Sequence, residues 1–288
     1  MGTNRETFMA GFNGLRVLSF ESRRAKEIAH LIANNGGQPV VAPSTREIAT
    51  PNEDEQRLIQ GILAGNFDAV IFMTGVGARA LIEAADAVSS RQEFLASLGK
   101  LQVIVRGPKP AAVMRELNVP VALTVPEPNT WREIVKVLDE NPDFVPLRNR
   151  RIAVQEHGEP SPALYAALQE RGAEVFSARV YRWELPEDLA PLQDAVRSLI
   201  NNEIDIVLFT SSVQYVHAAK VAAQMGVEQQ FKSALNRALV ASIGPVASEA
   251  LRKNGIRVDL EPSHPKMGFL VKQTAEQSAE LIRKKLGN

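Results

Sequence analysis

Cysteine is absent from this 288-residue sequence, which excludes disulfides, thiolate metal sites, iron–sulfur clusters and thiol nucleophiles. Histidine is scarce, with four residues, so we predict no metal site. No apolar run approaches the roughly 20 residues of a membrane span, and the run up to Gly14 lacks the apolar core of a secretory signal. Lysine plus arginine number 33, as do aspartate plus glutamate, so no excess of positive charge favours nucleic acid. We expect a cytoplasmic protein that binds neither nucleic acid nor a membrane.

Apolar residues are plentiful, at 45% of the chain, and they follow an alternating pattern. Leu15–Phe20 is a predicted strand, and Ser22–Asn35 is a predicted helix that Gly36 and Gly37 end. Continuous Val, Ile and Leu runs are typical of parallel strands that are covered on both faces. Such runs occur at Asp68–Met73, Val103–Val105, Ile152–Val154, Ile206–Phe209 and Leu239–Ile243. The pattern predicts an α/β protein, and at about 150 residues per domain the length predicts two domains.

The two halves of the chain resemble each other. Three segments of the first half match segments of the second half, namely Asp68–Phe72 with Asp205–Phe209, Gly107-Pro108 with Gly244-Pro245, and Leu15–Gly36 with Arg151–Gly172. The first two pairs share a shift of 137 positions (68 to 205 and 107 to 244), and the third pair has a small drift in register. The sequence therefore predicts two similar parallel-sheet α/β lobes, flavodoxin- or Rossmann-like, that arose by internal duplication.

The candidate binding residues lie where strands lead into helices. In parallel α/β sheets, ligands bind beyond the carboxyl ends of the strands, where helix N-termini present free N–H groups. In the first half these corners contain Arg23, Arg24, Thr74, Gly75, Gly107 and Lys109. In the second half they contain Thr210, Ser211, Ser212, Gly244, Pro245 and Val246.

Two of these corners allow more than one interpretation. The turn at 74–77 opens a helix as a dinucleotide-binding loop does, but Ala80 stands where that fingerprint needs a third glycine, which favours a simple tight turn. The hydroxyl groups of Thr210, Ser211 and Ser212 could cap a helix, act as a nucleophile or donate hydrogen bonds to an anion. Anion binding is the favoured interpretation of the three.

Charged and titratable side chains at the corners are also open to two interpretations. Arg23, Arg24, Arg106 and Lys109 could hold carboxylates, arginine through its bidentate fork, or be solvated surface charge. His157, in a glycine-containing loop, could be a general base or an exposed structural residue.

From Leu15 onward the chain resembles the uroporphyrinogen-III synthase family. The resemblance rests on the order and spacing of several segments, namely Gly36–Pro43, Arg171–Val175 leading to Val180-Tyr181, Phe209–Ser212 and Ser242–Pro245. It implies two α/β lobes joined by two extended linkers, with residues 1–47 and 183–288 in the first lobe and 48–182 in the second. It also implies that corners from both lobes face one cleft.

The resemblance further implies a reaction and its requirements. Family members cyclise the linear tetrapyrrole hydroxymethylbilane to uroporphyrinogen III, with loss of water and inversion of the last pyrrole ring, in porphyrin and heme biosynthesis. This hydro-lyase chemistry needs no cofactor, because the electron-rich pyrrole drives loss of the hydroxyl and the protein mainly positions the chain. Tyr181 matches the family tyrosine that assists the leaving hydroxyl, and its reference pKa of about 10 suits proton donation. The implied partner is the tetrapyrrole alone, received by a monomer from the preceding enzyme.

The chain also departs from the family pattern. Val246 and Ala247 follow the second Gly-Pro turn where the family often has threonine, so backbone N–H groups must bind there. The segment Phe20–Arg24 replaces the usual Thr-Arg-Pro after the first strand. Two other functions stay open, since fold alone does not decide function. One is a non-catalytic two-lobed small-molecule binding protein, and the other is a nucleotide-dependent enzyme built on the turn at 74–77.

Overall fold

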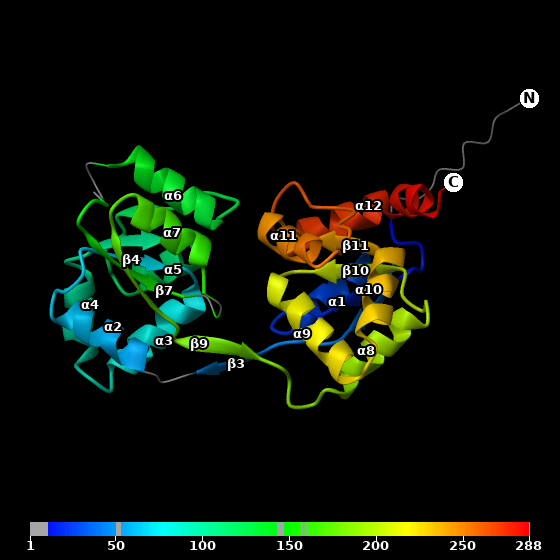
Figure 1. Ribbon diagram of the computed structural model, residues 1–288, viewed down its shortest axis with the longest axis horizontal. Coiled ribbons are helices and arrows are strands. Elements are labelled where there is room, and N and C mark those ends of the chain that lie inside the picture. The colour runs from blue at the N-terminus through cyan, green and yellow to red at the C-terminus, as the bar shows by residue number, and fades with distance from the viewer. Residues whose placement is uncertain (1–10, 50–52, 143–146, 157, 159, 288) are drawn as a thin grey trace, which may run out of the picture. The chain divides into compact units, whose positions relative to one another are not determined.

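The computed structural model describes residues 11–49, 53–142, 147–156, 158 and 160–287. These residues form two compact units (Figure 1). Unit 1 contains the described residues up to Arg46 together with those from Glu184 onwards, and unit 2 contains Glu47–Trp183. Unit 1 is therefore discontinuous in sequence, because unit 2 is inserted between its two segments.

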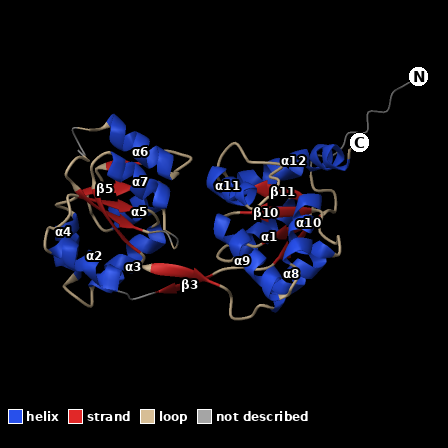
Figure 2. Cartoon of the chain, viewed as in Figure 1, coloured by secondary structure: helices blue, strands red, loops and turns tan. Residues whose placement is uncertain are grey.

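Unit 1 is built on a four-stranded parallel sheet with the strand order β11-β10-β1-β2. Its strands are β1 (Arg16–Ser19), β2 (Gln38–Val41), β10 (Ile206–Phe209) and β11 (Leu239–Ser242). Its helices are α1 (Ala25–Asn34), α8 (Ala190–Ile200), α9 (Ser212–Gln224), α10 (Glu228–Arg237), α11 (Pro245–Lys253) and α12 (Met267–Leu286). Helices α1 and α12 pack on one face of the sheet and α8–α11 on the other. Figure 2 shows the strands of each unit surrounded by its helices.

Unit 2 contains a five-stranded parallel sheet with the order β6-β5-β4-β7-β8. Its strands are β4 (Ala69–Phe72), β5 (Gln102–Val105), β6 (Leu123–Thr124), β7 (Arg151–Gln155) and β8 (Glu174–Ala178). Its helices are α2 (Glu53–Leu63), α3 (Gly75–Ala85), α4 (Arg91–Leu98), α5 (Pro108–Glu116), α6 (Trp131–Glu140) and α7 (Pro162–Glu170). Helices α2–α5 pack on one face and α6 and α7 on the other. No described helix of either unit is both long enough and apolar enough to cross a membrane.

Each sheet separates two hydrophobic cores. Val17 belongs to the core under α1 and α12, whereas its neighbour Leu18 belongs to the core under α8–α11. In unit 2, Val70 and Ile71 divide between the two cores in the same way. Successive side chains of a strand point to opposite faces, so a strand covered on both faces must be apolar at nearly every position. The predicted fold class, parallel-sheet α/β, is confirmed.

The internal duplication is visible in the pairing of the strands. Strands β4 and β5 pair with Ala69 opposite Gln102, and β10 and β11 pair with Ile206 opposite Leu239, each residue 137 positions (69 to 206, 102 to 239) after its counterpart. The place of β6 beside β5 is taken in unit 1 by Leu260, which forms a single parallel bridge with β11. The two units therefore share one strand order as well as similar sequences.

Two strands carry the chain between the units. The chain leaves unit 1 through β3 (Arg46–Ala49) and returns through β9 (Tyr181–Glu184), and these strands pair as a two-stranded sheet. Nη2 of Arg46, from β3, lies 3.4 Å from Oε2 of Glu184 in β9, and the same guanidinium pairs with Glu187. The two linkers are therefore held to each other by backbone pairing and by ion pairs.

Candidate functional site

The carboxyl ends of the unit 2 strands bring four predicted site residues together. Thr74 is the N-cap of α3, and its Oγ1 accepts a hydrogen bond from the Gly77 N–H at 3.0 Å. Gly75 lies against the next corner, since a Cβ there would come within 3.0 Å of the Lys109 carbonyl oxygen. Gly107 and Lys109 belong to that next corner, where β5 leads into α5. Thr74, Gly75, Gly107 and Lys109 therefore form one cluster.

Close packing requires glycine at position 77, in the first turn of α3, and at position 107 of the cluster. A Cβ at Gly77 would lie 1.9 Å from Nε2 of Gln155, whose Oε1 accepts the Thr74 N–H at 3.4 Å. Gly107 has a φ of +135°, and a Cβ there would lie 2.6 Å from the side-chain amide of Asn129. The glycine at 77 thus makes room for a side chain of the protein itself, which supports the tight-turn interpretation of residues 74–77.

Glu156, directly after β7, is a buried carboxyl at the same edge of the sheet. Its exposed fraction is 0%, and neither carboxyl oxygen has a hydrogen-bond partner in the described structure. Burial raises the pKa of Glu156 from 4.5 to about 8, against the opposing effect of Arg179 and Arg106. Arg106 directly follows β5 and Arg179 directly follows β8, so both belong to the carboxyl edge. At neutral pH the Glu156 carboxyl is therefore mainly protonated.

We expect the free energy of unfolding to fall as the pH rises, because the folded protein holds a proton on Glu156. The unfolded pKa is near 4.5 and the folded pKa is about 8. The stabilisation is therefore complete below about pH 4.5 and is lost as the pH rises through about 8. The full loss is about 5 kcal/mol, at roughly 1.4 kcal/mol for each unit of the pKa difference. Glu55 in α2 adds to the trend, since burial raises its pKa to about 7.

Denaturant titrations of the wild type and of Glu156→Gln measure this loss. Between about pH 6 and pH 9 the wild type should lose about 3 kcal/mol relative to the variant. Glu170→Gln, at the exposed end of α7, is the control and should follow the wild type. A difference between wild type and Glu156→Gln that stays constant with pH would contradict a protonated Glu156.

The equivalent corner of unit 1 also contains a glutamate. Ala69 and Ile206 are equivalent residues of the duplication. Ile152 of β7 pairs with Ala69, and Val17 of β1 pairs with Ile206, so β7 and β1 occupy equivalent places in the two sheets. Glu21 lies four residues after Val17, and Glu156 lies four residues after Ile152. The duplication therefore places one glutamate at the carboxyl end of the corresponding strand in each unit.

Unlike Glu156, Glu21 is held by hydrogen bonds. The Thr210 hydroxyl donates to Oε2 of Glu21, and Nε2 of Gln214 donates to the same oxygen at 3.2 Å. The Arg24 N–H donates to Oε1 of Glu21 at 3.1 Å, which keeps residues 21–24 in a turn, and α1 begins at Ala25 instead of the predicted Ser22. The Thr210 N–H donates to Oε1 of Gln214 at 2.8 Å. Both donors of Thr210, predicted for an anion, are therefore used within the protein.

The remaining predicted residues of the unit 1 corner lie at the first turns of α9 and α11. Ser211 is the N-cap of α9 but makes no side-chain capping bond, so capping does not account for its hydroxyl. The side chains of Ser211 and Ser212 are half-buried, which leaves their hydroxyls within reach of a ligand. Pro245 is the first residue of α11, and Val246 after it is 45% exposed. Val246 therefore presents an apolar side chain, and only backbone N–H groups can bind an anion there.

The predicted basic residues of the first helix differ from each other. Arg24 is the N-cap of α1, and its guanidinium forms an ion pair with Glu27 one turn along the same exposed surface. Arg23 is exposed beside it. Arg24 would have to leave Glu27 in order to hold a carboxylate of a ligand. Among the described residues, no three histidine or acidic side chains gather as metal ligands.

Comparison with known proteins assigns the chain to a family. Residues 26–272 match the family model described as uroporphyrinogen-III synthase HemD. This chain belongs to the uroporphyrinogen-III synthase family. YjjA, an uncharacterised protein of Bacillus subtilis strain 168, is 30% identical over 271 residues, which are 94% of this chain and 98% of YjjA.

Solved structures of uroporphyrinogen-III synthases have the same fold. A mutant enzyme from the extremely thermophilic bacterium Thermus thermophilus matches with a TM-score of 0.69 and 24% identity, covering 94% of this chain and 100% of that one. The enzyme from Helicobacter pylori 26695 matches with a TM-score of 0.51 and 15% identity, covering 93% and 98%. The predicted family and its two-lobed α/β fold are confirmed.

The structure does not describe the side chains of two residues that the sequence analysis singled out, Tyr181 and His157. Tyr181, matched to the family tyrosine, is the first residue of β9, and its side chain lies outside the described part of the structure. His157, the predicted alternative base, lies outside the described residues altogether. The catalytic role of Tyr181 and the role of His157 stay predictions.

Sequence reasoning missed the importance of two glutamates and one arginine. In the loop after β7 it singled out His157, whereas the structure draws attention to Glu156 and to Arg179 at the end of β8. Glu21 was overlooked inside the departure from the family motif. The available signal was the duplication itself, because residues 17–21 and 152–156 are equivalent and each segment ends in glutamate.

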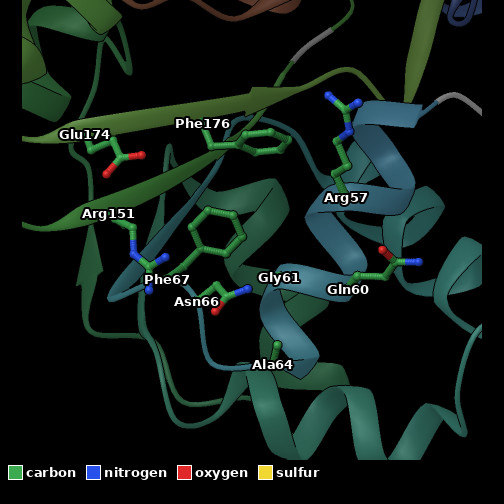
Figure 3. Close-up of a pocket in the computed structure, with 9 residues that line it drawn as sticks. All are labelled: Arg57, Gln60, Gly61, Ala64, Asn66, Phe67, Arg151, Glu174 and Phe176. Atoms are coloured by element: carbon green, nitrogen blue, oxygen red, sulfur yellow. The ribbon is translucent and has the colours of Figure 1, made fainter.

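A separate pocket of about 380 Å³ opens at the opposite edge of the unit 2 sheet. Its lining includes Arg151 and Glu174, the first residues of β7 and β8, and Arg57 of α2. The rings of Phe67 and Phe176 form its apolar part, with centroids 5.7 Å apart (Figure 3). None of the predicted site residues lines it. Ligands of parallel α/β sheets bind at the carboxyl edge, so the amino edge is not where the family chemistry is expected.

Proposed function

We propose that this protein is a uroporphyrinogen-III synthase, a hydro-lyase that cyclises hydroxymethylbilane with inversion of the last pyrrole ring. The observation that carries the proposal is the family match, which runs from α1 in unit 1 through the whole of unit 2 and back to α12. It therefore includes almost all of the corners at which a ligand of this fold would bind. The proposal extends the family relationship to one reaction on one substrate.

The proposed reaction places modest demands on the protein. Loss of hydroxide from the hydroxymethyl carbon leaves a cation that the attached pyrrole stabilises, and ring closure later releases a proton from the attacked pyrrole carbon. No metal, thiol or nucleotide takes part in these steps. The protein has to fold a flexible polyanion so that the reacting carbons meet, which is catalysis by positioning. Tyr181 would donate a hydrogen bond or proton to the departing hydroxyl.

The chain offers donors suited to the carboxylates of such a substrate. In unit 2, Lys109 is exposed and Arg106 half-buried beside the first turns of α3 and α5. In unit 1, the hydroxyls of Ser211 and Ser212 lie at the first turn of α9. Free backbone N–H groups at helix N-termini favour anions through both hydrogen bonding and the helix dipole.

Incubation with freshly prepared hydroxymethylbilane, followed by separation of the product isomers, tests the proposal. We expect the asymmetric type III isomer in excess of a protein-free control. Formation of the symmetric type I isomer alone would overturn the proposal. Saturable binding of the bilane without any turnover would favour the non-catalytic binding protein instead.

A further inference from the structure

Glu156 is a buried polar group whose environment the fold alone does not explain. Its carboxyl is fully buried, lacks a hydrogen-bond partner in the described structure and directly follows a central strand of the unit 2 sheet. A buried carboxyl without partners is costly, especially when ionised, and structures rarely retain one without a use. The equivalent Glu21 shows the alternative, because it is satisfied by Thr210, Gln214 and the Arg24 N–H.

Two arginines act on the Glu156 carboxyl from opposite sides of its strand. Arg106 follows β5 and is half-buried, and Arg179 follows β8 and is exposed. Strands β5 and β8 flank the pair β4 and β7. Because each arginine follows its strand, both residues lie at the carboxyl edge of the sheet, as do Thr74, Gly75 and Lys109. Neither arginine hydrogen-bonds the carboxyl in this structure. A guanidinium fork is well suited to a carboxylate of a ligand.

We propose that Glu156, Arg106 and Arg179 form a proton-coupled anion clamp, in which neutral Glu156 allows both guanidinium groups to hold a ligand carboxylate and ionised Glu156 draws them inward. Glu156 is thus a positioning residue, and Arg106 and Arg179 are the binding residues. The proposal rests on the proposed function for its ligand class, a polycarboxylate tetrapyrrole. It assigns the clamp to unit 2 alone, because Glu21 already has its hydrogen bonds.

The clamp has a thermodynamic consequence that a purely structural glutamate lacks. If the ligand carboxylate and ionised Glu156 compete for the same arginines, then binding at high pH requires Glu156 to take up a proton. The pKa of Glu156, about 8, places this effect in an accessible range. Above about pH 8, affinity should fall up to tenfold per pH unit, and binding should be accompanied by proton uptake. The acetate and propionate groups of the ligand are ionised throughout and contribute no such change.

Calorimetric titration of the whole protein with uroporphyrin III, the stable oxidised form of the proposed product, measures both quantities. Titrations in two buffers of different ionisation enthalpy, at about pH 6.5 and pH 8.5, give the number of protons taken up. We expect about half a proton or more at the higher pH in the wild type and none at the lower pH. Glu156→Gln should bind with the same affinity at both pH values, with no proton uptake. Arg106→Gln and Arg179→Gln should each weaken binding at about pH 6.5, and Glu170→Gln should behave as the wild type.

Each outcome decides the proposal. Wild-type affinity that does not change with pH, or a Glu156→Gln variant with the wild-type pH dependence, would overturn the clamp even if the protein makes the type III isomer. Proton-coupled binding without any turnover would support the clamp and overturn the proposed reaction. Absence of binding at every pH would overturn both. If Glu156→Gln does not fold, the proton uptake of the wild type and the affinities of the two arginine variants still test the clamp.

Discussion

Replacing Tyr181 with phenylalanine is expected to lower the turnover of hydroxymethylbilane by about 100-fold or more, because a positioned general acid contributes about 10²–10⁴-fold. The substitution removes one hydroxyl and keeps the ring, so the affinity for uroporphyrin III should change little. Tyr181 is the first residue of the returning linker β9 and lies two residues after Arg179, which follows β8. Single-turnover rates and equilibrium titrations measure the two effects separately.

Tyr165→Phe is the matched control for this experiment. The Tyr165 hydroxyl accepts a hydrogen bond from the Ser161 N–H at 3.0 Å within the first turns of α7, and Tyr165 is not a predicted site residue. Its replacement should leave turnover unchanged. Normal turnover in Tyr181→Phe would reduce Tyr181 to a structural residue of the linker. Equal losses of turnover and of affinity would instead indicate that the linker is distorted.

Breaking the buried ion pair between Asp259 and Lys285 should lower the free energy of unfolding by about 3–5 kcal/mol. The two side chains are only 3% and 8% exposed. Oδ2 of Asp259 also accepts the Val240 N–H at 2.9 Å, and Lys285 donates to the Ala238 carbonyl. The pair therefore joins the end of α12 to the edge strand β11. Asp259→Ala leaves a buried ammonium without its counter-charge, which is the origin of the large cost.

The double variant Asp259→Ala with Lys285→Met should recover most of that loss, because it removes both charges and keeps an apolar stem at position 285. The pair Glu280–Lys284 on the same helix is the control, with side chains 62% and 65% exposed. Glu280→Gln should leave the free energy of unfolding nearly unchanged, because solvent screens an exposed ion pair. Denaturant titrations at fixed pH measure the free energy of unfolding of all three variants. A similarly small loss in Asp259→Ala would contradict the prediction that breaking the buried ion pair strongly destabilises the protein.

The parallel α/β fold could be predicted because its signals are local. The runs at 69–73 and 206–209 are apolar at successive positions, as a strand covered on both faces requires. The duplication predicted two similar α/β lobes, and the equivalent pairing of β4 with β5 and of β10 with β11 agrees with it. The pairing of the linker strands β3 and β9 could not be predicted, because it joins segments more than 130 positions apart without a local signal.

The candidate site could be predicted only as a set of corners. Sequence reasoning favoured Thr210 as an anion donor and left Arg24 open between binding a carboxylate and being solvated surface charge. In the structure the Thr210 hydroxyl donates to Glu21, and the Arg24 guanidinium pairs with Glu27. It placed Thr74, Gly75, Gly107 and Lys109 at strand ends, and the contacts of Gly75 with Lys109 bring them together. These differences depend on which side chains meet across neighbouring strands, which no single segment encodes.

The sequence by itself determined the strands, the helices, their duplicated order and the family, because periodicity, turn residues and the repeated segments are properties of the chain taken in order. Only the tertiary structure decided that Glu21 is hydrogen-bonded, whereas the carboxyl of the equivalent Glu156 is buried without a hydrogen-bond partner and feels the charges of two arginines. The physical reason is that burial, hydrogen bonding and pKa depend on atoms supplied by distant segments. Burial raises the pKa of Glu156, and the charges of Arg179 and Arg106, which come from other strands, oppose that rise.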